Sequence, residues 1–348
     1  MEQTKEILVG KTLEELEEIV KERGWPKYTA RQLAEWIYQK NVSAFDEMTN
    51  LPKKIREVLK SDFEAGLTGH LKVSISTDGT KKYLYPYGPL KLIETAYIPE
   101  ETRNTLCVSS QIGCKMGCLF CMTGKQGFQG NLTAGQIVNQ VLSLPERNHL
   151  TNIVYMGMGE PFDNLKEVMK SVEIFTSPWG LGMSPKRITV STIGVVPAMK
   201  EFVEHSNAHL AISLHTPFED ERRKLMPIEN VYSLQQLIDT LHEYDFGRQR
   251  RVSFEYIMFK GYNDQKRHVN QITKLLHGLR ARINLIRFHP IPGTPLEGSD
   301  DHTIEWFRDE LIKKGIKTTI RASRGQDIEA ACGLLSTKEM VQSSDPDY

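Results

Sequence analysis

Three cysteines, Cys114, Cys118 and Cys121, crowd into one short stretch of the chain. On a helix this spacing would place them on one face, because residues three and four apart are neighbours there. Gly113 and Gly117 favour a loop instead, since glycine weakens helices and permits tight curvature. Three thiolates from one loop are typical of an iron–sulfur cluster, which soft cysteine ligands select. One iron of a four-iron cluster would then lack a protein ligand and could bind a small molecule.

A structural zinc site is the alternative for these cysteines. Such a site has four ligands and commonly two separated cysteine pairs. This sequence has a single C-x-x-C pair, Cys118 to Cys121, which favours the iron–sulfur interpretation. The two other cysteines are Cys107 and Cys332. Five cysteines in 348 residues do not make a disulfide scaffold, and in a reducing compartment they indicate metal binding or catalysis.

The length of 348 residues suffices for one large α/β domain and a small accessory domain. The 44 basic and 44 acidic residues balance, so net charge neither indicates nor excludes a nucleic-acid partner. We find no apolar run of membrane-spanning length and no signal-peptide pattern. The sequence therefore predicts a cytoplasmic protein without a membrane partner.

Residues 1–95 are predicted to form an N-terminal accessory domain of helices followed by a β-hairpin. Thr12 and Glu15 form a capping box before an apolar stripe of helical period, and further helices are expected near 29–40 and from about 52. Asp78-Gly79 separates two alternating segments, which indicates a hairpin. A following strand, 91–98, carries Glu94. Basic residues that could contact RNA phosphates, or simply form solvated surfaces, are Lys53, Lys54, Arg56, Lys60, Arg248, Arg250 and Arg251.

From about residue 96 to 330 short apolar strands alternate with amphipathic helices. The expected strands lie near 105–109, 152–156, 187–191, 209–214, 252–257, 283–288 and 317–321. The expected helices lie near 133–144, 165–176, 196–205, 233–244, 264–276 and 303–314. This alternation predicts an α/β fold with a parallel sheet. Too few units for eight indicate an incomplete (β/α)6-type barrel, followed by a C-terminal segment, 331–348, that carries Cys332.

Chemistry in such folds gathers at the carboxyl ends of the strands. The three-cysteine loop follows the first barrel strand. The other strand ends carry Gly157-Met158-Gly159-Glu160-Pro161, Ser191-Thr192-Ile193-Gly194, Ser213-Leu214-His215 and Arg287-Phe288-His289-Pro290. Together these motifs form one rim that offers a carboxylate, hydroxyl groups and glycines at which the backbone can approach a ligand closely. This rim suits S-adenosylmethionine, whose amino and carboxylate groups could chelate the free iron of a 4Fe-4S cluster.

The sequence resembles a known family at these positions. The C-x3-C-x2-C loop is the signature of radical S-adenosylmethionine (radical SAM) enzymes, and the wider motif set is similar to that of the RlmN/Cfr family of RNA adenine methyltransferases. The residues that carry the resemblance are Cys107 to Cys114, the strand-end motifs 157–161, 191–194 and 213–215, and Asp327-Ile328-Glu329-Ala330-Ala331-Cys332-Gly333. It extends from the N-terminal helices to Gly333. The pairing of the Ala-Ala-Cys-Gly element with Cys107 is its most specific part.

The resemblance implies a fold, a reaction and a set of site residues. The fold would be a radical SAM barrel, with Cys114, Cys118 and Cys121 on the 4Fe-4S cluster. The cofactor contacts would be Gly159, Glu160, Ser191, Ser213, Leu214, His215 and His289, the last replacing an Asn of several relatives. Two S-adenosylmethionine molecules would be used per turnover. Cys332 would carry a methyl group, Glu94 would act as the base, and Cys107 would form a transient disulfide with Cys332.

The implied substrate is an adenine in 23S rRNA, and in tRNA for many members of the carbon-2 branch. The reductant would be a flavodoxin or ferredoxin system. Three alternatives stay open at this point: methylation at carbon 8, a radical SAM activase, and a non-catalytic RNA-binding module with structural zinc. Pro290-Ile291-Pro292-Gly293 is more similar to the carbon-2 branch than to the carbon-8 branch.

Overall fold

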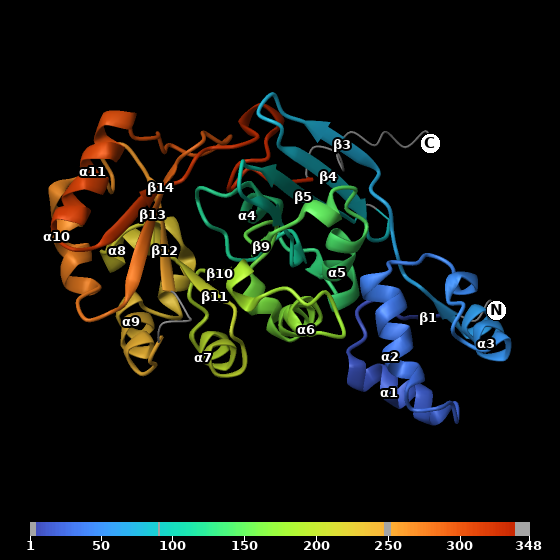
Figure 1. The fold of residues 1–348 in the computed structure, drawn as a ribbon. Helices are drawn as coiled ribbons and strands as arrows, with labels where there is room; N and C mark the ends of the chain where they lie inside the picture. The colour runs from blue at the N-terminus through green and yellow to red at the C-terminus, as the bar shows by residue number, and fades with distance from the viewer. Residues whose placement is uncertain (1–4, 90, 247–251, 338–348) are drawn as a thin grey trace.

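A computed structural model describes residues 5–89, 91–246 and 252–337 (Figure 1). The N-terminal region holds α1 (Leu13–Glu22), α2 (Thr29–Ala34) with a π-helical continuation (Glu35–Gln39), and α3 (Lys53–Asp62). The predicted capping box is present in α1, where Thr12 and Glu15 bond each other's backbone N–H. A short parallel pair, β1 (Glu6–Ile7) with β2 (Phe63–Glu64), ties the two ends of this region together.

The predicted hairpin is also present. Strand β3 (Lys72–Ile75) pairs with β4 (Lys81–Pro86), and β4 pairs with β5 (Leu92–Pro99), in both cases antiparallel. The turn between β3 and β4 needs glycine, because Gly79 has φ +84°. The three strands extend the main sheet without a break, since β5 pairs with the first barrel strand. A single strand therefore crosses the position at which we expected one domain to end and the next to begin.

Seven strands of the main sheet are parallel, which confirms the predicted α/β barrel. They are β6 (Asn104–Cys107), β9 (Asn152–Tyr155), β10 (Ile188–Thr192), β11 (His209–Ser213), β12 (Val252–Met258), β13 (Ala281–Arg287) and β14 (Lys317–Ile320). The order across the ten strands is β14-β13-β12-β11-β10-β9-β6-β5-β4-β3. Strands β14 and β3 are thus the two edges of the described sheet, and the barrel does not close.

Helices connect successive parallel strands, as predicted. They are α5 (Ala134–Leu142), α6 (Leu165–Thr176), α7 (Val196–His205), α9 (Leu234–His242), α10 (Lys266–Leu275) and α11 (Asp301–Lys313). The sequence did not predict α4 (Met122–Gln126) and α8 (Glu219–Leu225), nor the small pair of β7 (Gln111–Ile112) with β8 (Gly130–Asn131). Among the described residues, no helix is both long enough and apolar enough to cross a membrane.

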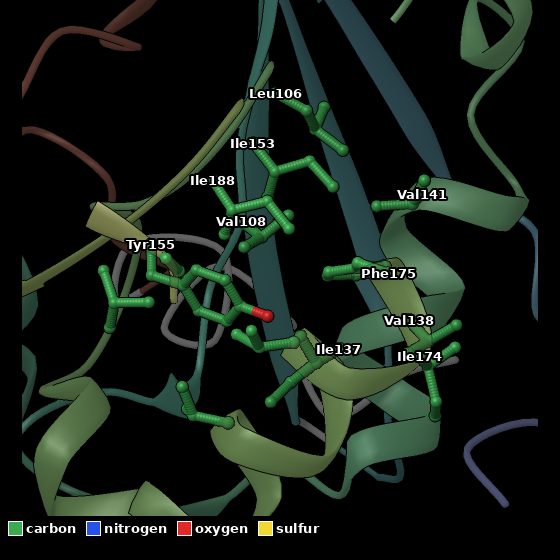
Figure 2. Close-up of a cluster of buried hydrophobic side chains, with 14 of the residues drawn as sticks. Leu106, Val108, Ile137, Val138, Val141, Ile153, Tyr155, Ile174, Phe175 and Ile188 are labelled. Atoms are coloured by element: carbon green, nitrogen blue, oxygen red, sulfur yellow. The ribbon is translucent and has the colours of Figure 1, made fainter. Parts of the chain in front are cut away.

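The two faces of the parallel sheet have different chemistry. Leu106, Ile153, Tyr155 and Ile188 point outward and pack against side chains of α5 and α6, such as Ile137 and Phe175 (Figure 2). Burial of this apolar surface drives the helices onto the sheet. The inner face is more polar and borders a cavity of about 800 Å³, whose wall includes Thr105, Asn152, Thr189, Ser253 and Asn284 beside apolar residues such as Val154 and Ile286.

Candidate active site

The three cysteines lie in a loop between β7 and α4, as the glycines predicted. At Gly113, with φ +70°, an added Cβ would lie 1.7 Å from the carbonyl oxygen of Gly127. No side chain fits there, and this close approach fixes the loop's curvature. Cys114 and Cys118 are buried and Cys121 is half-buried. Cys118 and Cys121 pack beside apolar residues that include Phe120, Ile193, Leu225 and Met226.

Burial raises the pKa of all three thiols, to about 12 for Cys114 and well above the usual value for Cys118. The negative charges of neighbouring thiolates push the pKa of Cys114 and Cys118 in the same direction. Bound iron would remove these protons, because a coordinated thiol is deprotonated. In the described part of the chain, no three His, Cys, Asp or Glu side chains converge on one metal ion. Three soft donors in an apolar shell fit a 4Fe-4S cluster, in which each thiolate binds a different iron.

Glu160 joins the ends of two strands beside this loop. Its carboxylate accepts hydrogen bonds from the backbone N–H groups of Phe162 and Ile193, both at 3.0 Å. The preceding Gly159 has φ +99°, and a Cβ there would lie 2.5 Å from the side chain of Gln111. Burial raises the pKa of Glu160 to about 7, against the hydrogen bonds that lower it. An ammonium group bound next to this carboxylate would restore its charge.

His215 follows β11 in a left-handed backbone conformation, φ +56°, which is uncommon for a residue with a Cβ. Its Nδ1 accepts a hydrogen bond from the N–H of Ile257 at 3.0 Å, so the proton of the neutral ring is on Nε2. Burial lowers the pKa of His215 to about 3, and the charge of Arg222 adds to this shift. The ring packs edge-on against Phe120 of the cysteine loop, with 4.7 Å between centroids. His215 is therefore a neutral donor beside the predicted iron–sulfur site.

The remaining predicted cofactor contacts lie nearby in the fold. Ser191 and Ser213 are half-buried on the neighbouring strands β10 and β11, and Leu214 is fully buried. His289 lines the central cavity, and its Nε2 lies 3.0 Å from Oγ of Ser323. Burial lowers the pKa of His289.

Two residues that hold these strand ends were missed by the sequence analysis. Arg222 of α8, 1 % exposed, donates to the carbonyl oxygens of Ile193 (2.6 Å) and Ser213 (3.2 Å) and pairs with Glu229. Asn263 donates to the carbonyl oxygens of His215 and Ile257, each at 2.6 Å. Arg222 lies in the charged run of α8, a composition typical of a solvated surface, so no sequence signal distinguished it.

Cys107 and Cys332 lie on the wall of the same cavity. Cys107 ends β6 and is buried, whereas Cys332 is exposed, and both are free thiols. Burial raises the pKa of Cys107 to about 12, and the charge of Cys332 adds to that shift. The pKa of Cys121 is also raised, first by burial and to a lesser extent by Cys332. Cys332 shares the cavity wall with Cys107, and its neighbour Gly333 accepts a backbone hydrogen bond from Met122, which follows Cys121, at 2.8 Å.

Arg321, a third residue that the sequence analysis missed, accompanies this cysteine pair. Its Nη1 lies 3.3 Å from a carboxylate oxygen of Glu255, whose other oxygen accepts from Asn284 at 2.8 Å. Burial alone would lower the pKa of Arg321, but Glu255, Cys332 and Cys107 raise it above the usual value. The sequence signal for this ion pair was Glu255, the single carboxylate within the buried segment 252–258, because a buried charge requires a partner.

Glu94 is not among the described residues that line the cavity. It is 1 % exposed on β5, with one carboxylate oxygen 2.9 Å from Nζ of Lys82. The other oxygen accepts from the backbone N–H of Ser336 at 2.9 Å, so the C-terminal segment covers this side chain. Burial raises the pKa of Glu94, while Lys82 opposes the shift.

The basic residues proposed for RNA binding separate into two groups. On α3, Lys60 pairs with Asp46 at 2.5 Å, Lys53 lies 3.9 Å from Glu57, and Arg56 donates to the backbone of Asp46. The second group, Arg248, Arg250 and Arg251, lies outside the described residues.

Two family models match the chain. "Radical SAM superfamily" matches residues 108–271, and "Ribosomal RNA large subunit methyltransferase N-terminal domain" matches residues 7–65. A "Probable dual-specificity RNA methyltransferase RlmN" from Phocaeicola vulgatus is 56% identical over 337 residues, which cover 97% of each chain. A "Dual-specificity RNA methyltransferase RlmN" from Nitratiruptor is 43% identical, covering 94% of this chain and 96% of that protein. The crystal structure of a radical SAM methyltransferase from Sphaerobacter thermophilus superposes with a TM-score of 0.88 at 39% identity, covering 95% of this chain and 99% of that one.

Proposed function

The chain belongs to the RlmN family of radical SAM RNA methyltransferases, and from this membership we propose that it methylates carbon 2 of an adenine in 23S rRNA and in tRNA. The observation that carries the proposal is the position of Cys332: it lines one cavity with Cys107, and the backbone hydrogen bond from Met122 to Gly333, 2.8 Å, holds it beside Cys121. A methyl-carrying thiol needs both neighbours: a radical source to activate it and a second thiol to release it.

Carbon 2 of adenine is electron-poor and cannot attack a sulfonium methyl group, so polar transfer alone is excluded on chemical grounds. When bound, the 4Fe-4S cluster supplies one electron to S-adenosylmethionine, whose cleavage gives a carbon radical. Cys114, Cys118 and Cys121 would hold the cluster. Glu160, Ser191, Ser213, the backbone at Gly159 and Leu214, His215 and His289 would orient the cofactor. Glu160 suits its ammonium group, and the Nε2–H of His215 suits an acceptor atom.

Cys332 acts first as a nucleophile in the proposed sequence. Its sulfur takes the methyl group of one S-adenosylmethionine, and S-adenosylhomocysteine leaves. The radical from a second S-adenosylmethionine removes a hydrogen atom from that methyl group. The methylene radical on Cys332 adds to carbon 2 of adenine, forming the new carbon–carbon bond. One electron would return from the adduct to the oxidised iron–sulfur cluster, and the carbon-2 proton would leave to a base.

Glu94 is the proposed base for that proton. Its raised pKa favours proton acceptance near neutral pH, and Lys82 is placed to stabilise its charge. The carboxylate must reach the substrate, which requires the C-terminal segment at Ser336 to withdraw from it. We therefore propose that this segment moves during turnover.

Cys107 completes the proposed cycle. Its thiolate attacks the sulfur of Cys332, a disulfide forms, and the carbon–sulfur bond breaks. The electron pair goes to the methylene carbon, which takes a proton and becomes the methyl group of the product. A thiol reductant then restores both cysteines. A flavodoxin or ferredoxin system would supply the single electrons, in the cytoplasm where ribosomal RNA is found.

We propose three functional units for this chemistry: residues 1–95 as an accessory unit, 96–330 as the radical SAM core, and 331–348 as the segment that delivers Cys332. Backbone hydrogen bonds such as Met122 N–H to Gly333 C=O, 2.8 Å, hold the described part of that segment against the cysteine loop.

The decisive experiment uses Cys107→Ala. Under turnover with unmodified rRNA, we expect this variant to accumulate a covalent protein–RNA adduct on a denaturing gel, because the release step needs Cys107. The matched control is Cys107→Ala combined with Cys332→Ala, which should give no adduct. Absence of adduct from the single variant would exclude the role given to Cys107. Digestion of wild-type product then identifies the isomer, and 8-methyladenosine would overturn carbon-2 specificity.

A further inference from the structure

The central cavity has two chemically different ends. One end carries Cys107, Cys332 and Arg321, at the carboxyl ends of the strands. The other end carries four basic residues, which we call the basic rim: Arg103, Lys186, Arg187 and Arg282. Arg103 and Arg187 directly precede β6 and β10, and Arg282 is the second residue of β13. Amino ends of parallel strands share one edge of a sheet, so the basic rim lies opposite the cysteine end.

A partly polar surface connects the two ends. The strand residues of this wall include Thr105, Asn152, Thr189, Ser253 and Asn284, and nearer the cysteines also Val154, Met156 and Ile286. The parallel strands of most α/β proteins are apolar on both faces. The hydroxyl and amide groups on this face can instead form hydrogen bonds with a polar substrate in the cavity. A nucleoside has such donors and acceptors on its base and its ribose.

The dimensions suit one nucleotide that leaves its strand. From Arg103 to Cys107 the chain is a single strand of four residues, β6, which spans roughly 13 Å at about 3.3 Å per residue. A base that is turned out of its stack could reach Cys332 over this distance while its flanking phosphates stay outside. Enzymes that modify bases commonly extrude the target nucleotide in this way.

The charges at the basic rim suit phosphate. Arg103, Lys186 and Arg187 are exposed and Arg282 is half-buried. Arg103 pairs with Glu100 at 2.8 Å, and Arg187 donates to the amide oxygen of Asn152 at 3.3 Å. An exposed ion pair of this kind contributes little to stability, so exchange of Glu100 for a phosphate would cost little. The other acidic residue of the cavity wall, Glu255, is already paired with Arg321.

We propose that the basic rim binds the phosphates of the RNA strand that flank the target adenine, and that the adenine reaches Cys332 along the polar inner face of the sheet. The RNA thus approaches from the amino-terminal edge of the parallel strands. This inference rests on the proposed function and adds the route and the residues of substrate binding. The basic residues of α3 form the alternative RNA-binding surface. Helix α3 lies at the opposite end of the molecule from α10 and α11 (Figure 1).

The test compares two triple variants that remove equal charge. One replaces Lys186, Arg187 and Arg282 with alanine, and the other replaces Lys53, Lys54 and Lys60. Binding of an unmodified tRNA transcript to the full-length, iron-loaded protein is measured over a series of salt concentrations. Each lost phosphate contact should reduce the slope of log affinity against log salt by about 0.7–0.9. For the rim variant we expect a slope smaller by roughly 2 and an affinity at least ~10-fold weaker, with the α3 variant unchanged.

Several outcomes would overturn the proposal: equal losses in both variants, loss in the α3 variant alone, or no loss in either. Unchanged thermal unfolding and iron absorbance must first show that each variant is folded. Arg187→Lys, which keeps the charge, should bind nearly as well as wild type. If wild-type protein forms no methyladenosine at all, the proposed function is wrong. If wild-type protein forms methyladenosine but the rim variant binds RNA normally, only the proposed role of the basic rim is wrong.

Discussion

The outer and inner faces of the parallel strands alternate along the same residues, yet they serve different purposes. On β10, Ile188 and Val190 point outward into the apolar core, whereas Thr189 between them borders the cavity. The outer face holds the helices on the sheet, and the inner face holds polar groups that contribute little to packing. We infer that stability depends mainly on one face and the reaction on the other. Substitutions at neighbouring residues of one strand should therefore have different effects: an outward residue should affect stability, and an inward residue should affect the reaction.

The largest expected effect concerns iron. Cys118→Ala removes one of three cluster ligands in the cysteine loop, so iron binding and methylation should both be abolished. Because the sheet packs through its other face, thermal unfolding of the variant should still be cooperative. Iron and methyladenosine analyses check this outcome. Cys107→Ala is the matched control and should keep its iron; full iron content in Cys118→Ala would contradict the assignment of the loop.

The next effect concerns reactivity within the cavity. The raised pKa of Cys107, about 12, leaves few thiolates at pH 8, so its alkylation should be roughly 10³-fold slower than that of a free thiol of ordinary pKa. The exposed Cys332 should be labelled first. The rate for Cys107 should rise about tenfold per pH unit up to pH 10, because only the thiolate reacts. Peptide mass spectrometry of the iron-loaded protein measures both rates, and equal labelling of the two cysteines would argue against the burial described.

The smallest effect tests the two faces directly. Ile188→Ala should lower the free energy of unfolding by about 2–5 kcal/mol, because it leaves a cavity in the core. Thr189→Ala, one residue away on the same strand, should change it by about 0.5 kcal/mol or less. Urea unfolding monitored by fluorescence gives both values. Similar losses for the two variants would show that the inner face also contributes to packing.

The sequence predicted those parts of the fold that depend on local patterns. Apolar runs such as 152–156 and 209–214 mark buried strands, and the capping residue Thr12 marks a helix start. Helix α8 was missed because its run Glu219–Leu225 has three acidic residues, then three basic residues and a single leucine, with little apolar content. Its burial depends on Arg222, whose partners come from strands distant in sequence. Tertiary contacts of this kind leave no periodicity to detect.

The candidate site was likewise predictable only where local sequence patterns mark it. Glycine-rich and polar strand ends located Glu160 and His215, since parallel strands place such ends together. The burial of Glu94 beneath Ser336 was not predictable, because it depends on how a segment far along the chain folds back. The basic rim was missed for a related reason. Its members are scattered over about 180 positions and meet only when the sheet forms.

Helix α4 has a consequence for how the protein matures. It begins directly after Cys121, and its residues hold the C-terminal segment by hydrogen bonds from Met122 to Gly333, Thr123 to Leu335 and Gln126 to Thr337. Energetic coupling between two sites is reciprocal. If iron orders the cysteine loop, it also secures the segment that carries Cys332, and a docked segment favours iron retention in return. Newly made protein would then be most open to proteolysis at this segment before its metal arrives.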